Sequence, residues 1–402
     1  MKITAMKLVL LVVSLALVNG CTSTTKKTAQ FDPVQFDKTF PDYQQETIIE
    51  PTSIFKLEGE VLKDVRNRIK YIASSQDKAR ALVENLLSPE RLKIDYEYGA
   101  NTIAEDTYLK GEANCLSLTI LAYSIAKEAR LNVKFQEVFE SESWNQEGQF
   151  DIINGHVNLL VSQPKNRLTP VGQMQQQRLI YTVDFFPSNQ TKGAKTEVIS
   201  KDQIIAYFYG NIGARALIAG DVNKAYANFR QALLFSPNDS GSWNNLGHLL
   251  TRVNAYELAE LSYQNAIDVQ PNNHSAWENL AKLYGKTDRL DEKLQIQDKL
   301  KRIRQNNPNY YLRIANRHLL QNELGDAISA YKQSIKLAPD NHFSHFGLAK
   351  AYGLLGDRKK VKFYLAKAKR VSEEREWRNR YQTKLEALAR GEYSRAPSHT
   401  GI

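Results

Sequence analysis

Three residues of the types used in thiol catalysis lie in the first half of the chain, in the order Cys115, His156 and Asp184. Cys115 follows Asn114, a plausible helix N-cap, and precedes a strongly apolar run, so we predict a buried helix that begins at the thiol. A thiol on the first turn of a helix lies where the helix dipole favours the nucleophilic thiolate. Of the seven histidines, His156 alone precedes residue 240, and it heads a predicted strand.

These residues suit a catalytic triad if two neighbouring antiparallel strands carry His156 and Asp184 and the Cys115 helix packs across them. Cys115 would then attack, His156 would take and return its proton, and Asp184 would orient the imidazole. We expect the Cys115 N–H in the oxyanion hole, with Tyr108 as a guess for the second donor. Asp151 is a weaker competitor for the role of Asp184.

A structural role for the cysteine stays open, because a free cysteine is most often a small buried hydrophobe. A zinc site built from the three residues is not favoured, because the sequence offers no second nearby cysteine and no close-spaced histidine pair. We therefore predict neither a metal nor a cofactor.

The surrounding pattern predicts an α+β domain over residues 51–200. Apolar residues at helical spacing indicate two helices before the Cys115 helix. After that helix the period changes to that of strands, and an antiparallel sheet is expected to pack on it. Residues 140–150 are predicted to be a loop, and the polar insert 162–178 has to loop out between the last two strands. The predicted strands are 133–139, 155–161 and 179–186.

Three short motifs carry a family resemblance: Gly-Glu-Ala-Asn-Cys-Leu-Ser-Leu around Cys115, Gly-His-Val-Asn around His156, and Thr-Val-Asp-Phe around Asp184. In this order they resemble the transglutaminase-like cysteine-enzyme superfamily, over roughly residues 90–190. The resemblance implies a papain-like fold core and acyl transfer at a Gln, Asn or peptide carbonyl. That superfamily includes proteases, amidases, cross-linking enzymes and inactive members, so the resemblance does not identify the substrate.

Residues 1–20 are predicted to be a targeting segment. Lys2 and Lys7 precede an apolar run that is too short to span a bilayer of about 30 Å as a helix. The run closes with Val-Asn-Gly before Cys21, which resembles the lipobox of bacterial lipoproteins. That resemblance implies that Cys21 becomes the acylated first residue, and Thr22 after it favours the outer membrane facing the periplasm. An ordinary cleaved signal peptide is the alternative.

A lipidated Cys21 would leave Cys115 as the lone thiol of the mature protein, because the sequence has two cysteines. Cysteines in the oxidising periplasm are mostly paired, so a lone thiol there needs a reason, and catalysis is one. Residues 21–50 are polar and lack an apolar period, and we predict a flexible tether between the lipid and the first folded unit.

The second half of the chain repeats every 34 residues, as Pro237, Pro271 and Pro339 show. The same frame aligns Gly213 and Gly247 at a position that must be small where two helices cross. The pattern is similar to the tetratricopeptide (TPR) repeat, an all-α solenoid of helix pairs. We predict five repeats over 206–375, a capping helix over 376–391 and a disordered tail over 392–402.

The third repeat departs from the pattern in its second helix, where Lys293, Gln297 and Leu300 replace Ala, an aromatic residue and Ala. We expect weaker packing there. Repeat arrays of this kind usually hold a protein or an extended peptide in a concave groove. The histidines His274, His342 and His345 are expected at the surface. The candidate groove residues are Asn244, Asn245, His248, Asn279, Arg313 and Arg317.

The formal net charge of +10 is spread along the chain. No element carries a stripe of Arg and Lys interleaved with aromatic residues, and the compartment argues against nucleic acid as a partner. The prediction is therefore a cell-envelope lipoprotein that transfers acyl groups through a Cys115 thioester, by hydrolysis or transamidation. Its partners would be a protein or peptide in the TPR groove and the membrane through Cys21. The alternative is an inactive transglutaminase-like scaffold that serves as a TPR interaction module.

Overall fold

The computed structural model describes residues 29–82, 95–97, 99–139, 144–147, 150–153, 156–162, 180–185, 195–372 and 375–391. The predicted leader 1–20, the lipidation site Cys21 and the tail 392–402 lie outside these residues, as does nearly all of the insert 162–178. Among the described helices, none is both long enough and apolar enough to cross a membrane.

The helix that begins at the thiol is α6 (Cys115–Glu128), and it is buried on almost every side. The Asn114 side chain caps it by accepting a hydrogen bond from the backbone N–H of Ser117 at 2.9 Å. Gly111 ends the preceding helix with φ of 73°, a left-handed conformation that glycine adopts without strain. The chain can therefore turn sharply from one helix into the next just before Cys115.

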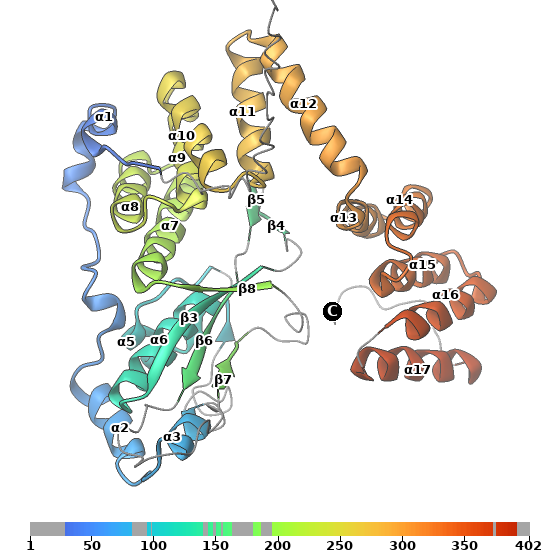
Figure 1. The fold of residues 1–402 in the computed structure, drawn as a ribbon, viewed down its shortest axis with the longest axis horizontal. Helices are drawn as coiled ribbons and strands as arrows, with labels where there is room; N and C mark the ends of the chain where they lie inside the picture. Colours follow the sequence, from blue (N-terminus) through green and yellow to red (C-terminus); the bar gives the residue numbers. More distant parts are fainter. Residues whose placement is uncertain are drawn as a thin grey trace, which may run out of the picture.

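A four-stranded antiparallel sheet packs on α6 in the strand order β7-β6-β3-β8 (Figure 1). Strands β3, β6 and β7 of this sheet correspond to the three strands predicted from the sequence. The edge strand β8 was not predicted, and a hairpin of β4 and β5 replaces part of the loop predicted over 140–150. The strands are β3 (Asn132–Phe139), β4 (Trp144–Glu147), β5 (Phe150–Ile153), β6 (His156–Ser162), β7 (Ile180–Val183) and β8 (Lys195–Ile199).

Short helices complete this unit and share one apolar core with α6, the sheet and the first turns of the solenoid. The parallel pair β1 and β2 lies just before α6. These elements are η2 (Ser53–Phe55), α2 (Gly59–Ile69), α3 (Ser75–Ala81), β1 (Asp95–Tyr96), α5 (Ala104–Lys110) and β2 (Glu112–Ala113).

The second half forms the predicted TPR solenoid of five helix pairs and a final helix (Figure 1). Gly213 and Gly247 lie where the two helices of a pair cross: a Cβ at either position would be 2.6 or 2.7 Å from the ring of Phe229 or Tyr263. The helices are α7 (Lys201–Ala219), α8 (Val222–Phe235), α9 (Ser240–Arg252), α10 (Tyr256–Val269), α11 (His274–Lys286), α12 (Leu290–Gln305), α13 (Pro308–Leu320), α14 (Leu324–Leu337), α15 (His342–Leu354), α16 (Arg358–Val371) and α17 (Arg375–Ala389).

A left-handed residue follows the first helix of every repeat, again at intervals of 34 residues. A positive φ at this place reverses the chain so that the second helix can pack back on the first. Glycine, asparagine and aspartate tolerate that conformation best. The five positions are Gly220 (φ 87°), Asn254 (φ 61°), Asp288 (φ 58°), Asn322 (φ 61°) and Gly356 (φ 78°).

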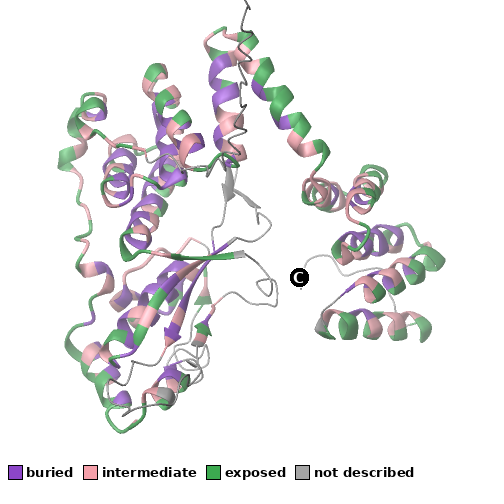
Figure 2. Cartoon of the chain, in the orientation of Figure 1, coloured by how far each residue is buried: buried purple, intermediate pink, exposed green. Residues whose placement is uncertain are grey.

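Weak packing in the third repeat agrees with its departure from the consensus. In α12 the buried residues are Ile296 and Leu300, and most of this helix is exposed in Figure 2. One apolar core runs through the repeats up to Leu300, and a separate core begins at Ala315 in the fourth repeat. The solenoid thus consists of two packed blocks joined through α12 (Figure 1).

The tether predicted over 21–50 is wrong for the described part, residues 29–50. Helix α1 (Pro33–Asp37) and the 3₁₀ helix η1 (Pro41–Gln45) pack on the solenoid. Phe36 is 1% exposed and Phe40 is 2% exposed, and the Phe40 ring stacks on Tyr226 with the ring centroids 4.3 Å apart. The two buried phenylalanines, with Phe31 and Tyr43 packed beside them, supply the apolar area that holds this stretch against the solenoid.

A half-buried polar cluster adds to this contact. Asp37 accepts hydrogen bonds from the Tyr226 hydroxyl at 2.6 Å and from Arg230 Nε at 2.9 Å. Burial alone would raise the pKa of Asp37, but the bonds from Arg230 and Tyr226 outweigh it, and the pKa is lowered. The carboxylate therefore stays charged, and the segment is held by both apolar and polar contacts.

Two histidines predicted at the surface are instead packed in the fifth repeat. His345 is 6% exposed, and its Nε2 lies 2.9 Å from the Pro339 carbonyl oxygen. His342 is half-buried, with Nδ1 2.8 Å from the Tyr381 hydroxyl of the last helix. The surface prediction was wrong for His345 because its imidazole fills the aromatic position that Trp243 and Trp277 occupy in the earlier repeats.

We predict that Phe36→Ala will lower the free energy of unfolding by about 3–5 kcal/mol, the usual cost of truncating a buried phenylalanine. Denaturant unfolding followed by tryptophan fluorescence measures this, because the Phe36 and Trp243 rings lie 6.0 Å apart. The control is Val34→Ala, whose side chain is 63% exposed and which should cost less than about 0.5 kcal/mol. Equal stabilities of the two variants would contradict the packed segment and support a tether.

Candidate functional site

Cys115 occupies the first position of α6 and is half-buried. The first N–H groups of a helix have no acceptor within the helix, and together with the helix dipole they favour negative charge beside them. The thiol therefore lies where both a thiolate and a developing oxyanion would be stabilised.

His156 and Asp184 are brought together at the end of the sheet. The Nε2 atom of His156 lies 2.7 Å from Oδ1 of Asp184. His156 begins β6, and Asp184 follows β7 directly. Continuing the pairing of Leu159 with Val183 puts Asp184 opposite Asn158, so His156, two residues before Asn158 on the same face, is the diagonal neighbour of Asp184. The strand register thus makes the contact that was predicted from antiparallel neighbours.

The imidazole also faces the thiol. Burial by itself lowers the pKa of His156, but the hydrogen bond to Asp184 and then the influence of Cys115 raise it to about 9. The side chain of His156 is only 5% exposed, whereas that of Asp184 is 22% exposed. The Nε2 atom faces Asp184, and the other ring nitrogen, Nδ1, is buried. The imidazole is therefore bonded to the carboxylate, and Cys115 is close enough to raise its pKa.

Direct contacts between α6 and β6 hold the site in place. Thr119, one turn after Cys115, donates a hydrogen bond from Oγ1 to the carbonyl of Val157 at 3.1 Å. Thr119 and Val157 are both buried, and the apolar residues of the two elements pack in one core. A contact one residue from His156 thereby fixes the distance between the strand and the start of the helix.

The sequence prediction missed Asn158, which lies two residues after His156 and thus on the same face of β6. Its Nδ2 donates to Oδ2 of Asp184 at 3.4 Å, so the carboxylate bonds the imidazole with one oxygen and the amide with the other. Asn158 is 3% exposed. The signal was present in the motif Gly-His-Val-Asn, because alternate residues of a strand share a face.

A second missed residue is Ser117, which ties a loop to the start of α6. Its hydroxyl donates to the Ala100 carbonyl at 3.1 Å and accepts from the Thr102 N–H at 2.8 Å. The Asn114 N–H donates to the same Ala100 carbonyl at 3.0 Å. The loop around Ala100 is therefore bonded to the residues on either side of Cys115. No periodicity in the sequence indicated this contact.

Two further candidates have other surroundings. The Tyr108 hydroxyl donates a hydrogen bond to Asp64 on α2, and burial together with this bond raises its pKa to about 12. Tyr108 thus bridges α5 and α2, in place of the oxyanion contact predicted for it. Asp151 lies in the β4–β5 hairpin, where its backbone pairs with Gln146, and its side chain is outside the described part of the structure.

Several candidate groove residues form a polar row on the first helices of the repeats. Asn279 on α11 donates from Nδ2 to Oδ1 of Asn244 on α9 at 3.1 Å, and Asn244 donates to its neighbour Asn245 at 3.3 Å. His248 lies on α9, the helix that carries Asn244 and Asn245. Arg313 and Arg317 lie beyond α12, in the second block of the solenoid.

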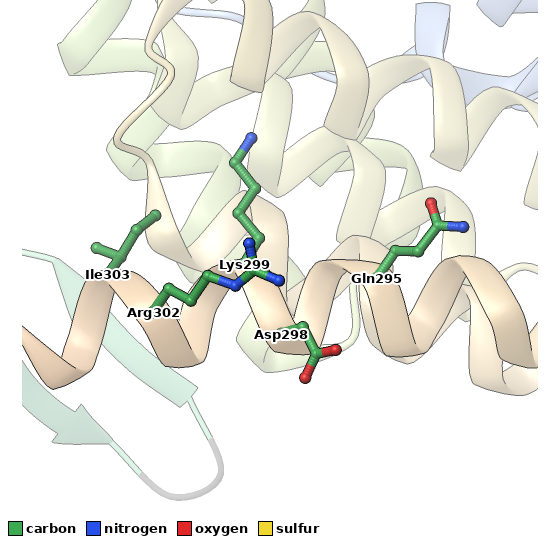
Figure 3. Close-up of a pocket in the computed structure, with 5 residues that line it drawn as sticks. All are labelled: Gln295, Asp298, Lys299, Arg302 and Ile303. Atoms are coloured by element: carbon green, nitrogen blue, oxygen red, sulfur yellow. The ribbon is translucent and has the colours of Figure 1, made fainter.

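Two other places could be considered for a ligand. His318, Glu323 and Asp326 bring potential metal-ligand atoms within 4.8 Å of one another, but Glu323 and Asp326 are exposed, and Glu323 accepts a hydrogen bond at the His318 ring. A surface hollow on α12 is lined by Gln295, Asp298, Lys299, Arg302 and Ile303. The Lys299 and Asp298 side chains point in opposite directions (Figure 3), so their charges do not converge on a ligand.

Known families match within the solenoid. The tetratricopeptide repeat family matches residues 240–273 and, in a second form, residues 262–295. No curated protein matches the chain. The second half is thus a TPR module, the class of domain that binds other proteins or peptides.

Several solved structures are similar to slightly less than half of this chain. They include "YrrB: a TPR protein with an unusual peptide-binding site", 15% identical, covering 44% of this chain and 92% of that one with a TM-score of 0.24. PilF of Pseudomonas aeruginosa is 19% identical and covers 44% and 82%, with a TM-score of 0.24. A thermophilic TPR protein of Thermus thermophilus is 19% identical and covers 45% and 99%, with a TM-score of 0.25.

The raised pKa of His156 predicts a pH-dependent stability. Because the folded pKa of about 9 exceeds the ordinary value of about 6.5, protonated His156 stabilises the fold fully below about pH 6.5, and this contribution is lost as the pH rises through about 9. We expect Asp184→Asn to lower the unfolding free energy at pH 6 by on the order of 2–3 kcal/mol and by much less at pH 10.

Denaturant unfolding at both pH values measures this difference. The matched control is Asp340→Asn, an exposed aspartate of the solenoid, which should have little effect at either pH. A loss of stability that is equal at pH 6 and pH 10 would contradict a charged pair between His156 and Asp184.

Proposed function

We propose that this chain is an envelope lipoprotein with a transglutaminase-like thiol site that transfers acyl groups, and that its TPR module recruits the protein that is acted on. The observation that carries the proposal is the linked arrangement at the start of α6. The Nε2 atom of His156 lies 2.7 Å from Oδ1 of Asp184, and Cys115 is the second group that raises the pKa of the imidazole. The order of these residues along the chain also matches the superfamily pattern described above.

In the proposed reaction the proton of Cys115 moves to His156, and the thiolate sulfur attacks an amide carbonyl carbon of the substrate. The tetrahedral oxyanion would lie beside the N–H groups that begin α6. As the C–N bond breaks, His156 returns the proton to the leaving amine, and a thioester at Cys115 remains. Water or a second amine then attacks the thioester with His156 as the base, which yields an acid or a new amide.

Asp184 and Asn158 are assigned supporting roles in this scheme. Asp184 stabilises the imidazolium that forms when Cys115 loses its proton, and Asn158 holds the second carboxylate oxygen at 3.4 Å. Lipidation at Cys21 would keep the protein at the outer membrane facing the periplasm. The lipobox resemblance of the leader is the support for that location.

A second candidate function is an interaction module in which the thiol domain is an inactive scaffold. The TPR family matches favour this alternative, because they lie within the solenoid, at residues 240–273 and 262–295. The two candidates differ in one property, which is the reactivity of Cys115. The TPR module would bind a protein or peptide in either case.

The experiment that tests the proposal is the alkylation rate of Cys115 as a function of pH. The full chain with Cys21→Ser leaves Cys115 as its single thiol. An imidazolium beside the sulfur favours the thiolate, so we expect a rate that changes less than about threefold between about pH 6 and pH 8. In the His156→Ala variant the rate should rise about tenfold per pH unit below about 8.5, as for an ordinary thiol.

The matched control is His345→Ala, a buried histidine far along the chain in the solenoid, which should leave the pH profile unchanged. Identical profiles for the parent chain and the His156→Ala variant would rule out an activated thiol and favour the scaffold.

A cellular test separates the two candidate functions. We predict that Cys115→Ala abolishes the function of the protein in cells while the melting temperature changes by less than about 4 °C, because a small side chain at a half-buried position costs little. Survival of the phenotype in this variant, with loss only when the repeats are deleted, would support the scaffold.

A further inference from the structure

One helix of the fifth repeat, α16, carries seven lysines and arginines and no aspartate or glutamate. Its buried side packs in the core of the second block. Three cations and a phenylalanine lie on the exposed side of its first two turns, and two leucines precede them at the end of α15. We call these six residues the α16 patch: Leu354, Leu355, Arg358, Lys359, Lys362 and Phe363.

The α16 patch combines exposed cations with exposed apolar side chains. Phe363 and Leu355 are each 55% exposed, and Leu354 is 39% exposed. The acidic residue that caps the helix, Asp357, pairs at 3.1 Å with Lys360, which is not part of the patch. The three cations of the patch are all exposed.

The prediction that no element interleaves basic and aromatic residues is wrong for α16. Phe363 follows Lys362 directly, and Lys367 Nζ lies 5.8 Å from the centroid of its ring. The pattern is thus that of an aromatic side chain surrounded by cations, and it calls for a partner with negative charge.

The fold of a repeat does not require these cations. The second helix of the second repeat, α10, buries the same positions of the repeat, yet it carries three acidic residues and no lysine or arginine. The charge on the exposed side is therefore not set by core packing. The counterparts of Lys359, Lys362 and Phe363, three repeats earlier, are Glu257, Glu260 and Leu261.

The cations are also unfavourable for the helix that carries them. Arg358 and Lys359 lie in its first turn, where the helix dipole disfavours positive charge. Lys362 follows them by four and three residues, so like charges are neighbours on the helix surface. An anionic partner that covers the α16 patch would relieve both repulsions.

The apolar residues of the patch distinguish one anionic partner from another. A nucleic acid would offer phosphates to the cations, but its backbone has no apolar phase in which Leu354 and Leu355 could be buried. A membrane surface offers both, because anionic headgroups lie directly above the start of the acyl chains. The composition of the patch therefore favours a lipid surface.

A second copy of the chain is a less suitable partner. The acidic face that it could offer is that of α10, where Glu260 accepts hydrogen bonds from Tyr284 and Arg289. Asp268 on the same helix accepts one from Gln264. Two of the three acidic residues of α10 are thus already bonded within the chain.

We propose that the α16 patch binds a membrane surface that carries anionic lipid headgroups. Its three cations contact the headgroup phosphates, and Phe363 and the two leucines enter the boundary between headgroups and acyl chains. This inference requires neither an active thiol at Cys115 nor a lipid at Cys21. If the proposed lipid is present, it would add a second membrane contact, because residues 29–45 pack on the first repeats, at the opposite end of the solenoid from α16 (Figure 1).

The first test is co-sedimentation of the full chain carrying Cys21→Ser with vesicles of phosphatidylcholine that contain about 30% phosphatidylglycerol. We expect binding to these vesicles and at least about tenfold weaker binding to phosphatidylcholine alone. Raising the salt concentration from about 0.1 M to about 1 M shortens the Debye length from about 10 Å to about 3 Å and should release most of the protein. The absence of binding to the anionic vesicles would overturn the proposal.

The second test removes charge from the α16 patch. Lys359→Gln with Lys362→Gln should weaken vesicle binding about tenfold or more, because each cation near an anionic surface adds to the affinity. The matched control is Lys224→Gln with Lys282→Gln, two exposed lysines of the first block, which should change the affinity less than about twofold. An equal loss in the two double variants would assign the binding to the net charge of the chain and overturn the patch.

The third test concerns the apolar residues. Phe363→Ala should weaken vesicle binding about threefold or more without a change of charge. The matched control is Leu261→Ala, its 36% exposed counterpart on the acidic helix α10, which should leave the affinity unchanged. An unchanged affinity in Phe363→Ala would overturn the burial of apolar side chains in the membrane.

Two further measurements separate the membrane from other partners. A single-stranded oligonucleotide that binds as tightly as the anionic vesicles, and that loses affinity in the Lys359→Gln, Lys362→Gln variant, would overturn the proposal in favour of nucleic acid. Self-association measured by light scattering, if that variant abolished it, would overturn the proposal in favour of a second copy. The pH profile of Cys115 alkylation should be unchanged in the same variant, so failure of the thiol proposal and failure of the membrane proposal are distinguishable.

Discussion

The structure depends on the burial of a single helix, α6. Ten of its 14 residues are buried, and its apolar side chains pack with the sheet, with α2 and α5, and with the first turns of α7. A helix surrounded in this way has one position and one orientation, so its first residue has them as well. Cys115 is that residue, and the caps and loop contacts made by Asn114 and Ser117 place the thiol beside His156. The precision of the site is therefore a consequence of core packing, to which the polar contacts add direction.

The same core joins the two halves of the chain. Phe208 and Tyr209 of the first solenoid helix lie in one apolar cluster with α6, and the segment of Phe36 and Phe40 packs on the repeats that follow. The thiol domain and the first repeats are thus packed together and are not two domains on a linker. The repeats and the start of α6 consequently have a fixed relation to each other.

Repetition governs the rest of the solenoid and also shows where it weakens. Each repeat reuses a small residue at the helix crossing and a left-handed residue between its helices, and Asn254, Asp288 and Asn322 take the place of glycine at three of the five turns. Where the third repeat replaces packing residues by Lys293 and Gln297, the apolar core divides after Leu300. The physical reason is that each repeat buries its surface only against its neighbours, so the loss is local.

The sequence by itself determined the repeat architecture, the buried helix at Cys115, three strands of the sheet and the residues His156 and Asp184 as candidates beside the thiol. These features follow from local periodicity, helix capping and residue type, all of which can be seen within a short stretch of the sequence. The tertiary structure alone decided the edge strand β8, the packing of residues 29–45, the contact of Asn158 with Asp184 and the contact of Asn211 with Asn101. Each of these depends on pairing between segments far apart in the sequence, and no local pattern encodes which distant partner a polar strand or a single asparagine will meet.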